Sequence, residues 1–151
     1  MQFLNESNRQ LVRERFDKEL DDDVTVTLFT QPDLKGLVVP GRDCESCAPT
    51  EQLLKEVSEL SSKVTLRTIN YRENTEESES FSIERIPTIV ISRDSETNVR
   101  YLGIPSGTEF PVLLEAIVNV SSGAPKLSDD TVTFLERLDS DVSIKVFVTP
   151  N

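Results

Sequence analysis

The sequence contains no histidine, and its only two cysteines lie three residues apart, at Cys44 and Cys47. Tetrahedral zinc needs four ligands, so this chain could hold such an ion only across two copies or with an external thiol. We therefore predict no metal and no bound cofactor. Two cysteines are also too few for the disulfide scaffold of a small secreted domain. Residues 1–20 are charged and lack an unbroken apolar stretch, which argues against a signal peptide or a membrane span.

Positive charge is scarce as well. The chain has 16 Lys and Arg residues against 27 Asp and Glu residues, for a net charge of −11. Phosphate binding needs clustered cations, so we predict no nucleic-acid partner. The 151 residues correspond to one domain or slightly more, enough to bury a core without disulfide staples. A lone pair of closely spaced cysteines is typical of a reducing compartment, and we predict a cytoplasmic protein that does not bind membranes.

The C-x-x-C pair lies between a β-branched run at 24–29 and a helix-like run at 51–60. Two thiols at this spacing can close into a small disulfide ring, and the amides and dipole at a helix start favour a thiolate. We therefore predict dithiol–disulfide exchange. Cys44 would sit at or just before the first helical residue and attack, while Cys47 would face inward and resolve the mixed disulfide. The alternative is a pair of inert, half-buried thiols.

Hydrophobic periodicity and turn residues predict an α/β domain. A helix over about 4–20, with Asn5 or Ser7 as its N-cap, is followed by the strand at 24–29 and a Pro- and Gly-containing loop at 31–43. The further elements are a helix at 51–60, a strand at 64–69, a short helix ending near 84, strands at 86–91 and 99–102, and a helix at 110–118. This order predicts a central mixed four-stranded sheet with helices on both faces, in which 24–29 and 89–91 are neighbours.

An internal repeat links the two ends of the chain. Residues 138–148 repeat residues 20–30 at a constant offset, and each copy follows an amphipathic helix. A match over this length that keeps its preceding helix predicts a true repeat rather than a chance likeness. We expect residues 1–123 to form a complete module and residues 124–151 to form the opening helix and strand of a truncated second one.

A lone strand at 142–148 would expose backbone donors and acceptors along both edges. We therefore expect this C-terminal half-repeat to dock on the first module or to exchange between two copies in a homodimer. The side chains that such contacts would bury are Phe134, Leu135, Leu138 and Phe147.

Four segments carry a family resemblance: residues 43–47 (DCESC), 59–65 (ELSSKVT), 86–88 (IPT) and above all 100–110 (RYLGIPSGTEF). Through them the chain resembles the glutaredoxin-like protein disulfide oxidoreductases of archaea and thermophiles, which have tandem thioredoxin folds. It is similar also to the N-terminal domain of the alkyl hydroperoxide reductase flavoprotein subunit. The resemblance covers nearly the whole chain and implies a thioredoxin-like fold.

The resemblance also implies roles for individual residues. Cys44 would be the attacking thiolate, Cys47 the resolving thiol and Pro87 a cis-proline beside them, and the Ile86 backbone would be free to pair with an extended substrate. Implied partners are protein or small-molecule disulfides as substrates, and a thioredoxin-reductase-like flavoprotein or glutathione as electron donor. The first module of the alkyl hydroperoxide reductase domain is typically degenerate, so the alternative function is a redox-silent adaptor or interaction module with the same fold.

Overall fold

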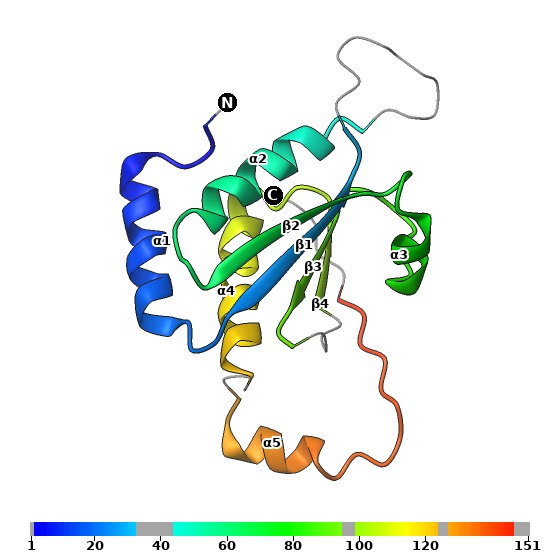
Figure 1. Cartoon of the computed structure of the whole chain (residues 1–151). Helices are drawn as coiled ribbons and strands as arrows, with labels where there is room; N and C mark the ends of the chain where they lie inside the picture. Colours follow the sequence, from blue (N-terminus) through cyan, green and yellow to red (C-terminus); the bar gives the residue numbers. More distant parts are fainter. Residues whose placement is uncertain (1, 33–43, 95–98, 124–126, 147–151) are drawn as a thin grey trace.

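The computed structural model describes residues 2–32, 44–94, 99–123 and 127–146 (Figure 1). The elements, in chain order, are α1 (Glu6–Glu19), β1 (Val24–Thr30), α2 (Cys47–Ser58), β2 (Val64–Asn70), α3 (Thr75–Ser80), β3 (Thr88–Ser92), β4 (Val99–Leu102), the 3-10 turn η1 (Gly107–Glu109), α4 (Phe110–Ser122) and α5 (Asp129–Leu135). The predicted order up to α4 is confirmed. Most of the predicted loop at 31–43 lies outside the described residues.

The strands form one mixed sheet in the order β2-β1-β3-β4. β1 is parallel to β2, with Val24 opposite Val64, and antiparallel to β3, with Phe29 opposite Thr88. β4 is antiparallel to β3 and forms one edge. The predicted four-stranded sheet is therefore confirmed, including the pairing of 24–29 with 89–91.

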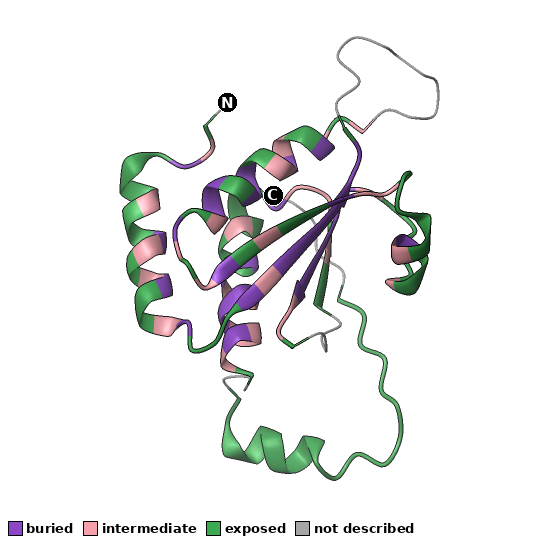
Figure 2. Cartoon of the chain, viewed as in Figure 1, coloured by how far each residue is buried: buried purple, intermediate pink, exposed green. Residues whose placement is uncertain are grey.

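Helices cover the sheet unequally (Figures 1 and 2). The larger core joins one face to α1, α2 and α4, and among its buried members are Phe16, Val26, Leu28, Leu54, Val57, Ile89, Leu113 and Ile117. On the other face a smaller cluster joins Phe29, Ile69 and Val90 to Ile83, in the segment that follows α3. Phe29 stacks in a tilted geometry on Phe81, with ring centroids 5.3 Å apart. The alternation of side chains along β1 accounts for the two clusters, because Leu28 and Phe29 point to opposite faces.

The N-terminal end of the chain is held by one buried carboxylate. Asn5 is the N-cap of α1 and its side chain accepts a hydrogen bond from the Asn8 amide, as predicted. Just before it, the Phe3 and Leu4 amides donate to the carboxylate of Glu56 on α2, at 2.9–3.1 Å. Glu56 is only 4% exposed. Its burial would by itself raise its pKa, but the hydrogen bonds from Gln52 and from the two amides hold the pKa below its usual value.

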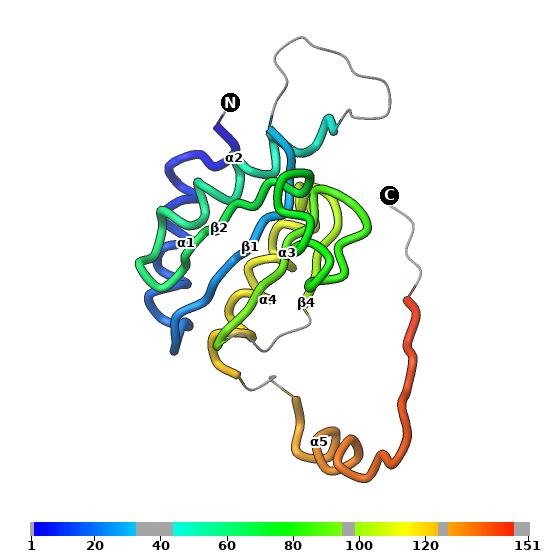
Figure 3. The backbone as a smooth tube through the Cα atoms, turned by 45° about the vertical axis from the view of Figure 1, so that its right-hand side comes forward, coloured from blue at the N-terminus to red at the C-terminus, as the bar shows by residue number. Residues whose placement is uncertain are grey.

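The C-terminal segment departs from the prediction. Ser128 caps α5 by accepting from the Thr131 amide, but residues 142–146 form no strand in this single chain. All residues from 127 to 146 are exposed, including Phe134 at 64%, Leu135 at 45% and Leu138 at 42%. Figures 1 and 3 show α5 and the residues after it apart from the sheet. Docking of this segment on the first module is therefore not observed, and Phe147 lies outside the described residues.

Among the described residues, no helix combines the length and the apolar character needed to cross a bilayer.

The Glu56 contact yields a stability prediction. Glu56→Gln replaces one carboxylate oxygen by an NH₂ group that cannot accept from the Phe3 or Leu4 amide, so we expect the free energy of unfolding at neutral pH to fall by about 1.5–3 kcal/mol. The carboxylate has a lowered pKa in the folded chain. The contribution of this carboxylate to the free energy of unfolding is therefore complete above the ordinary glutamate pKa, and it is lost as the pH falls through the lowered pKa. Urea unfolding curves across this acidic range should show the two proteins converging.

Glu59→Gln is the matched control. Glu59 pairs with Arg9 at 3.2 Å but its side chain is 63% exposed, so the same substitution should change the free energy of unfolding by less than about 1 kcal/mol. Equal effects of the two substitutions would contradict the assigned role of Glu56.

Candidate redox site

The two cysteines lie in a turn that leads into α2. The Cys47 amide donates to the Cys44 carbonyl at 3.3 Å, and the Ser46 carbonyl accepts from the Thr50 amide at 3.0 Å. Cys44 and Cys47 form a disulfide with a Cα–Cα distance of 5.4 Å. The helix begins at Cys47, so the prediction that Cys44 is at or just before its first residue is wrong, because Cys44 precedes that residue by three. The disulfide nevertheless holds the Cys44 sulfur beside the first turn of α2.

The two sulfurs differ in access. Cys47 is 2% exposed and belongs to the buried face of α2, together with Leu53, Leu54 and Val57. Cys44 is half-buried, and the next residue, Glu45, is exposed. The predicted inward orientation of Cys47 is therefore observed, and Cys44 is the sulfur that a second molecule can approach.

The segment before β3 contains the predicted cis peptide bond, between Ile86 and Pro87. Pro87 is buried, and its carbonyl accepts a hydrogen bond from the Gly103 amide at 2.9 Å. Gly103 has a φ of +90°, a conformation that favours glycine at this contact. Ile86 is half-buried, and within the described residues no hydrogen bond reaches its backbone. Its amide and carbonyl can therefore pair with a ligand.

Topology brings the cysteine turn and the Ile86 segment to one end of the sheet. β1 and β3 are antiparallel, so the end of β1, from which the chain continues toward Cys44, lies beside the start of β3, which follows Pro87. Figure 1 shows the start of α2 and the end of β1 at this same end of the sheet. The predicted site residues are thus drawn from two segments that are distant in the sequence and meet at one edge of the domain.

A loop after β4 lies against the Ile86 segment through the bond between Gly103 and Pro87. Tyr101 on β4 is half-buried, and burial together with a hydrogen bond from its hydroxyl to Glu109 raises the pKa of the phenol. The Tyr101 hydroxyl therefore stays protonated at neutral pH. The segment after β4 thus contacts the residue that precedes β3, through the hydrogen bond from Gly103 to Pro87.

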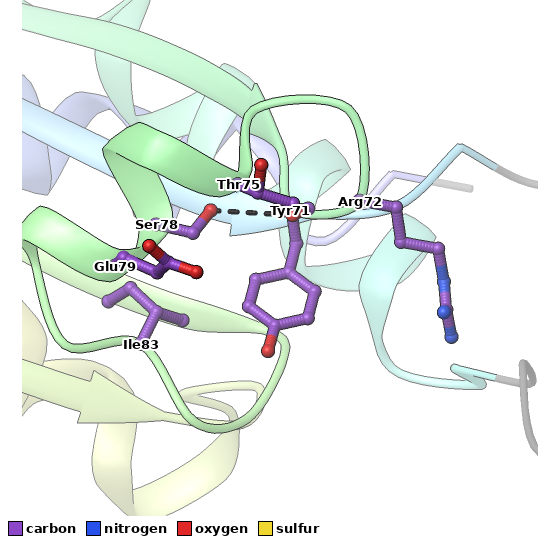
Figure 4. Close-up of a pocket in the computed structure, with 6 residues that line it drawn as sticks. All are labelled: Tyr71, Arg72, Thr75, Ser78, Glu79 and Ile83. Carbon is purple, nitrogen blue, oxygen red and sulfur yellow. Dashed lines mark hydrogen bonds between the residues drawn. The ribbon is translucent and has the colours of Figure 1, made fainter.

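A pocket of about 250 Å³ opens on the α3 side of the sheet (Figure 4). Its lining residues are Tyr71, Arg72, Thr75, Ser78, Glu79 and Ile83. Ile83 packs in the smaller cluster against which Ile86 also rests, so the pocket adjoins the segment that leads to Pro87. Arg72 Nε donates to Gln31 Oε1 at 3.2 Å and so ties this side of the pocket to the end of β1. Sequence reasoning missed the pocket because its residues fall in a polar stretch without a recognisable motif.

Within the described residues, no group of three or more His, Cys, Asp or Glu side chains could hold a metal ion. The chemistry that the arrangement offers is that of the two sulfurs.

Comparisons with known proteins identify relatives of the chain. No family model matches the chain. The alkyl hydroperoxide reductase protein AhpF from Staphylococcus epidermidis is 31% identical over 100 residues, which cover 66% of this chain and 17% of that protein. The homologous protein of Staphylococcus aureus is 30% identical over 106 residues, covering 70% of this chain and 18% of that protein. The chain thus spans less than a fifth of the length of these relatives.

Solved structures show the same relationship. The alkyl hydroperoxide reductase protein AhpF from Enterococcus faecalis superposes with a TM-score of 0.74 and 27% identity over 91% of this chain and 62% of that one. A protein disulfide oxidoreductase from Aeropyrum pernix superposes with a TM-score of 0.71 and 26% identity, over 89% of this chain and 55% of that one. A thioredoxin from Halobacterium salinarum, at 20% identity and a TM-score of 0.51, shares the fold. The chain is therefore homologous to part of AhpF and to a protein disulfide oxidoreductase, and it has a thioredoxin fold.

Proposed function

We propose that the chain is a thiol–disulfide oxidoreductase that exchanges the Cys44–Cys47 pair with substrate disulfides. The observation that carries the proposal is the disulfide itself, which joins a half-buried Cys44 to a Cys47 that is 2% exposed at the first residue of a helix. A relative that is named a protein disulfide oxidoreductase supports the same chemistry. The proposal assigns this activity to residues 1–123 and treats residues 124–151 as the start of a second module.

The reduced pair would act in two steps. The Cys44 thiolate attacks a substrate disulfide, a bond forms between its sulfur and one substrate sulfur, and the other substrate sulfur leaves as a thiolate that takes up a proton. Cys47 then loses its proton and attacks the Cys44 sulfur, which releases the second substrate thiol and forms the intramolecular disulfide. Two electrons pass from the pair to the substrate. The positive end of the α2 dipole, beside the Cys44 sulfur, stabilises the attacking thiolate.

Substrate binding in this proposal uses the backbone of Ile86. An extended segment on one side of the substrate disulfide would pair with the Ile86 amide and carbonyl as an added strand. Pro87 would lie beside this segment. The absence of a backbone partner for Ile86 within the described residues supports this assignment. The adjoining pocket at Tyr71 and Ile83 would then accept a substrate side chain.

The proposed partners follow from this chemistry. Protein or small-molecule disulfides are the substrates, and a thioredoxin-reductase-like flavoprotein or glutathione returns the electrons, as in a glutaredoxin-like electron-transfer protein. A cytoplasmic location is proposed because a dithiol that reduces substrate disulfides must itself be kept reduced, and the cytoplasm does so. The proposal also includes association of two copies through the C-terminal residues.

The order of reaction of the two thiols tests the assignment of Cys44 as the attacking sulfur. In the reduced chain, limiting iodoacetamide should modify Cys44 roughly tenfold faster than Cys47, because reactivity follows exposure and thiolate character. Peptide mass spectrometry at short times measures both rates. The guanidinium-unfolded chain is the control, in which the two rates should be similar. Faster modification of Cys47 in the folded chain would reverse the assigned roles.

Activity assays separate the oxidoreductase from a redox-silent adaptor. The wild-type chain should accelerate insulin reduction by dithiothreitol, and Cys44→Ser should lower the rate to that of dithiothreitol alone. Cys47→Ser should instead accumulate a mixed disulfide with substrate, because the resolving step is lost. Ser46→Ala, in the same turn, should keep activity because that side chain makes no capping bond. Equal rates for the wild type and Cys44→Ser would favour the adaptor.

A further inference from the structure

Thr30, the last residue of β1, has a buried hydroxyl without a partner. Thr30 is 3% exposed, and within the described residues its Oγ1 forms no hydrogen bond. The buried hydroxyl of Thr50, in the first turn of α2, does have a partner, because it donates to the Ser46 carbonyl at 2.6 Å. An unpaired buried hydroxyl lowers the free energy of unfolding, so such groups are rare and each needs a physical explanation.

The alternation of side chains along β1 places the Thr30 hydroxyl on the face of the sheet that α2 covers. Val26 and Leu28 belong to the larger core together with Leu54 of α2. Phe29 belongs to the smaller cluster on the opposite face. Side chains two positions apart along a strand share a face, so Thr30 points to the same face as Val26 and Leu28.

The connection between β1 and β2 brings Cys47 to the same end of this face. The two strands are parallel, so α2 runs back from the end of β1 toward the start of β2. The first turn of α2 therefore lies at the end of β1 (Figure 1). Cys47 is the first residue of α2 and is 2% exposed, on the buried face of the helix. The buried sulfur and the unpaired hydroxyl of Thr30 thus share one face and one end of the sheet.

We propose that Thr30 is a positioning residue for the resolving sulfur, and that its hydroxyl donates a hydrogen bond to Cys47 Sγ when the disulfide is reduced. This role presupposes the exchange reaction proposed above and concerns its second step. The sulfur of a disulfide is a weak acceptor, whereas a thiolate accepts charge-assisted hydrogen bonds, which are stronger. The oxidised chain therefore leaves the Thr30 hydroxyl unpaired, and reduction supplies its acceptor.

The hydrogen bond would lower the barrier to release of the substrate. In the second step the Cys47 thiol loses its proton and its sulfur bonds to the Cys44 sulfur. The bond between Cys44 and the substrate sulfur breaks, and the substrate leaves as a thiolate that takes up a proton. A thiol buried among apolar groups resists ionisation. A hydroxyl that donates to the developing thiolate favours the charged form and so opposes this effect of burial.

A buried carboxylate could assist the same step, but the one that the described residues contain is engaged elsewhere. Glu56 is the only Asp or Glu among their buried side chains. It lies near the other end of α2 and accepts hydrogen bonds from the Phe3 and Leu4 amides. The described part of the domain therefore offers the Thr30 hydroxyl, and no buried acid, at the start of α2.

The ionisation of Cys47 tests the proposal without any substrate. In the Cys44→Ala chain Cys47 is the remaining thiol, and an NMR titration of its side chain measures its pKa. Adding Thr30→Val, which removes the hydroxyl and keeps the size of the side chain, should raise this pKa by about one unit, a roughly tenfold loss of thiolate. Thr30→Ser should restore most of the difference, because it keeps the hydroxyl.

Thr27→Val is the matched control for this titration. Thr27 lies on the same strand and is also 3% exposed, but its position in the alternation places it on the opposite face. Its substitution should leave the Cys47 pKa unchanged. An equal Cys47 pKa in the Thr30→Val and Thr27→Val chains, or no recovery with Thr30→Ser, would overturn the proposal.

Rapid-mixing kinetics test the same role in the intact dithiol. When the reduced chain reacts with an aromatic disulfide, two thiols are released in turn, the first by Cys44 and the second by Cys47. Thr30→Val should slow the second release roughly tenfold at neutral pH and leave the first unchanged, and the difference should shrink at alkaline pH, where Cys47 is ionised in both chains. Equal second rates at neutral pH would contradict the role of Thr30. A chain that reduces no disulfide while its Cys47 pKa still depends on Thr30 would instead refute only the proposed exchange activity.

Discussion

The pairing of β1 along both of its edges positions the rest of the molecule. β1 is parallel to β2 and antiparallel to β3, so its last residues lie beside the first residues of β3. A parallel neighbour needs a crossover connection, which α2 supplies, and the cysteines lie at the start of that crossover. The same pairing brings Ile86 and Pro87 to the end of the sheet from which the chain continues toward Cys44. The candidate site is therefore a consequence of strand order.

The sequence predicted those helices and strands whose buried apolar residues recur at a regular spacing. The strands of the sheet and the helices α1, α2 and α4 were recognised because their alternation or helical spacing is clear, and Asn5 marked the start of α1. The start of α2 was placed four residues too late. Residues 47–50 (CAPT) lack apolar spacing, and the proline among them fits because the first turn of a helix needs no amide from it. The position expected for Cys44, at or just before the helix, was taken from its place in the C-x-x-C pair, whereas the helix starts at the second cysteine of that pair.

Local pattern could not predict the C-terminal segment. An alternation of β-branched and polar residues indicates which side chains a strand would bury, but burial also requires neighbouring elements that cover them. β1 obtains them from β2, β3 and three helices, whereas residues 142–146 have the same alternation and no partner within the described residues. The pocket at Tyr71 and Arg72 was missed for a related reason. Its lining residues all lie within the polar stretch 71–83, and nothing in their spacing shows that their side chains surround a cavity.

The two ends of the sheet differ in how their polar groups are satisfied, and this difference favours binding at the cysteine end. At the opposite end, the Ser121 hydroxyl donates to the Asp22 carbonyl at 2.6 Å and accepts from the Asp22 amide at 3.0 Å. Arg93 donates to the Ser121 carbonyl at 3.0 Å and packs where a side chain on Gly123 would lie. Backbone groups there are paired within the domain. Ile86 keeps an amide and a carbonyl without partners among the described residues. Leaving such backbone groups unpaired is costly when a ligand covers them. A substrate strand that forms hydrogen bonds with both groups is therefore favoured at this end.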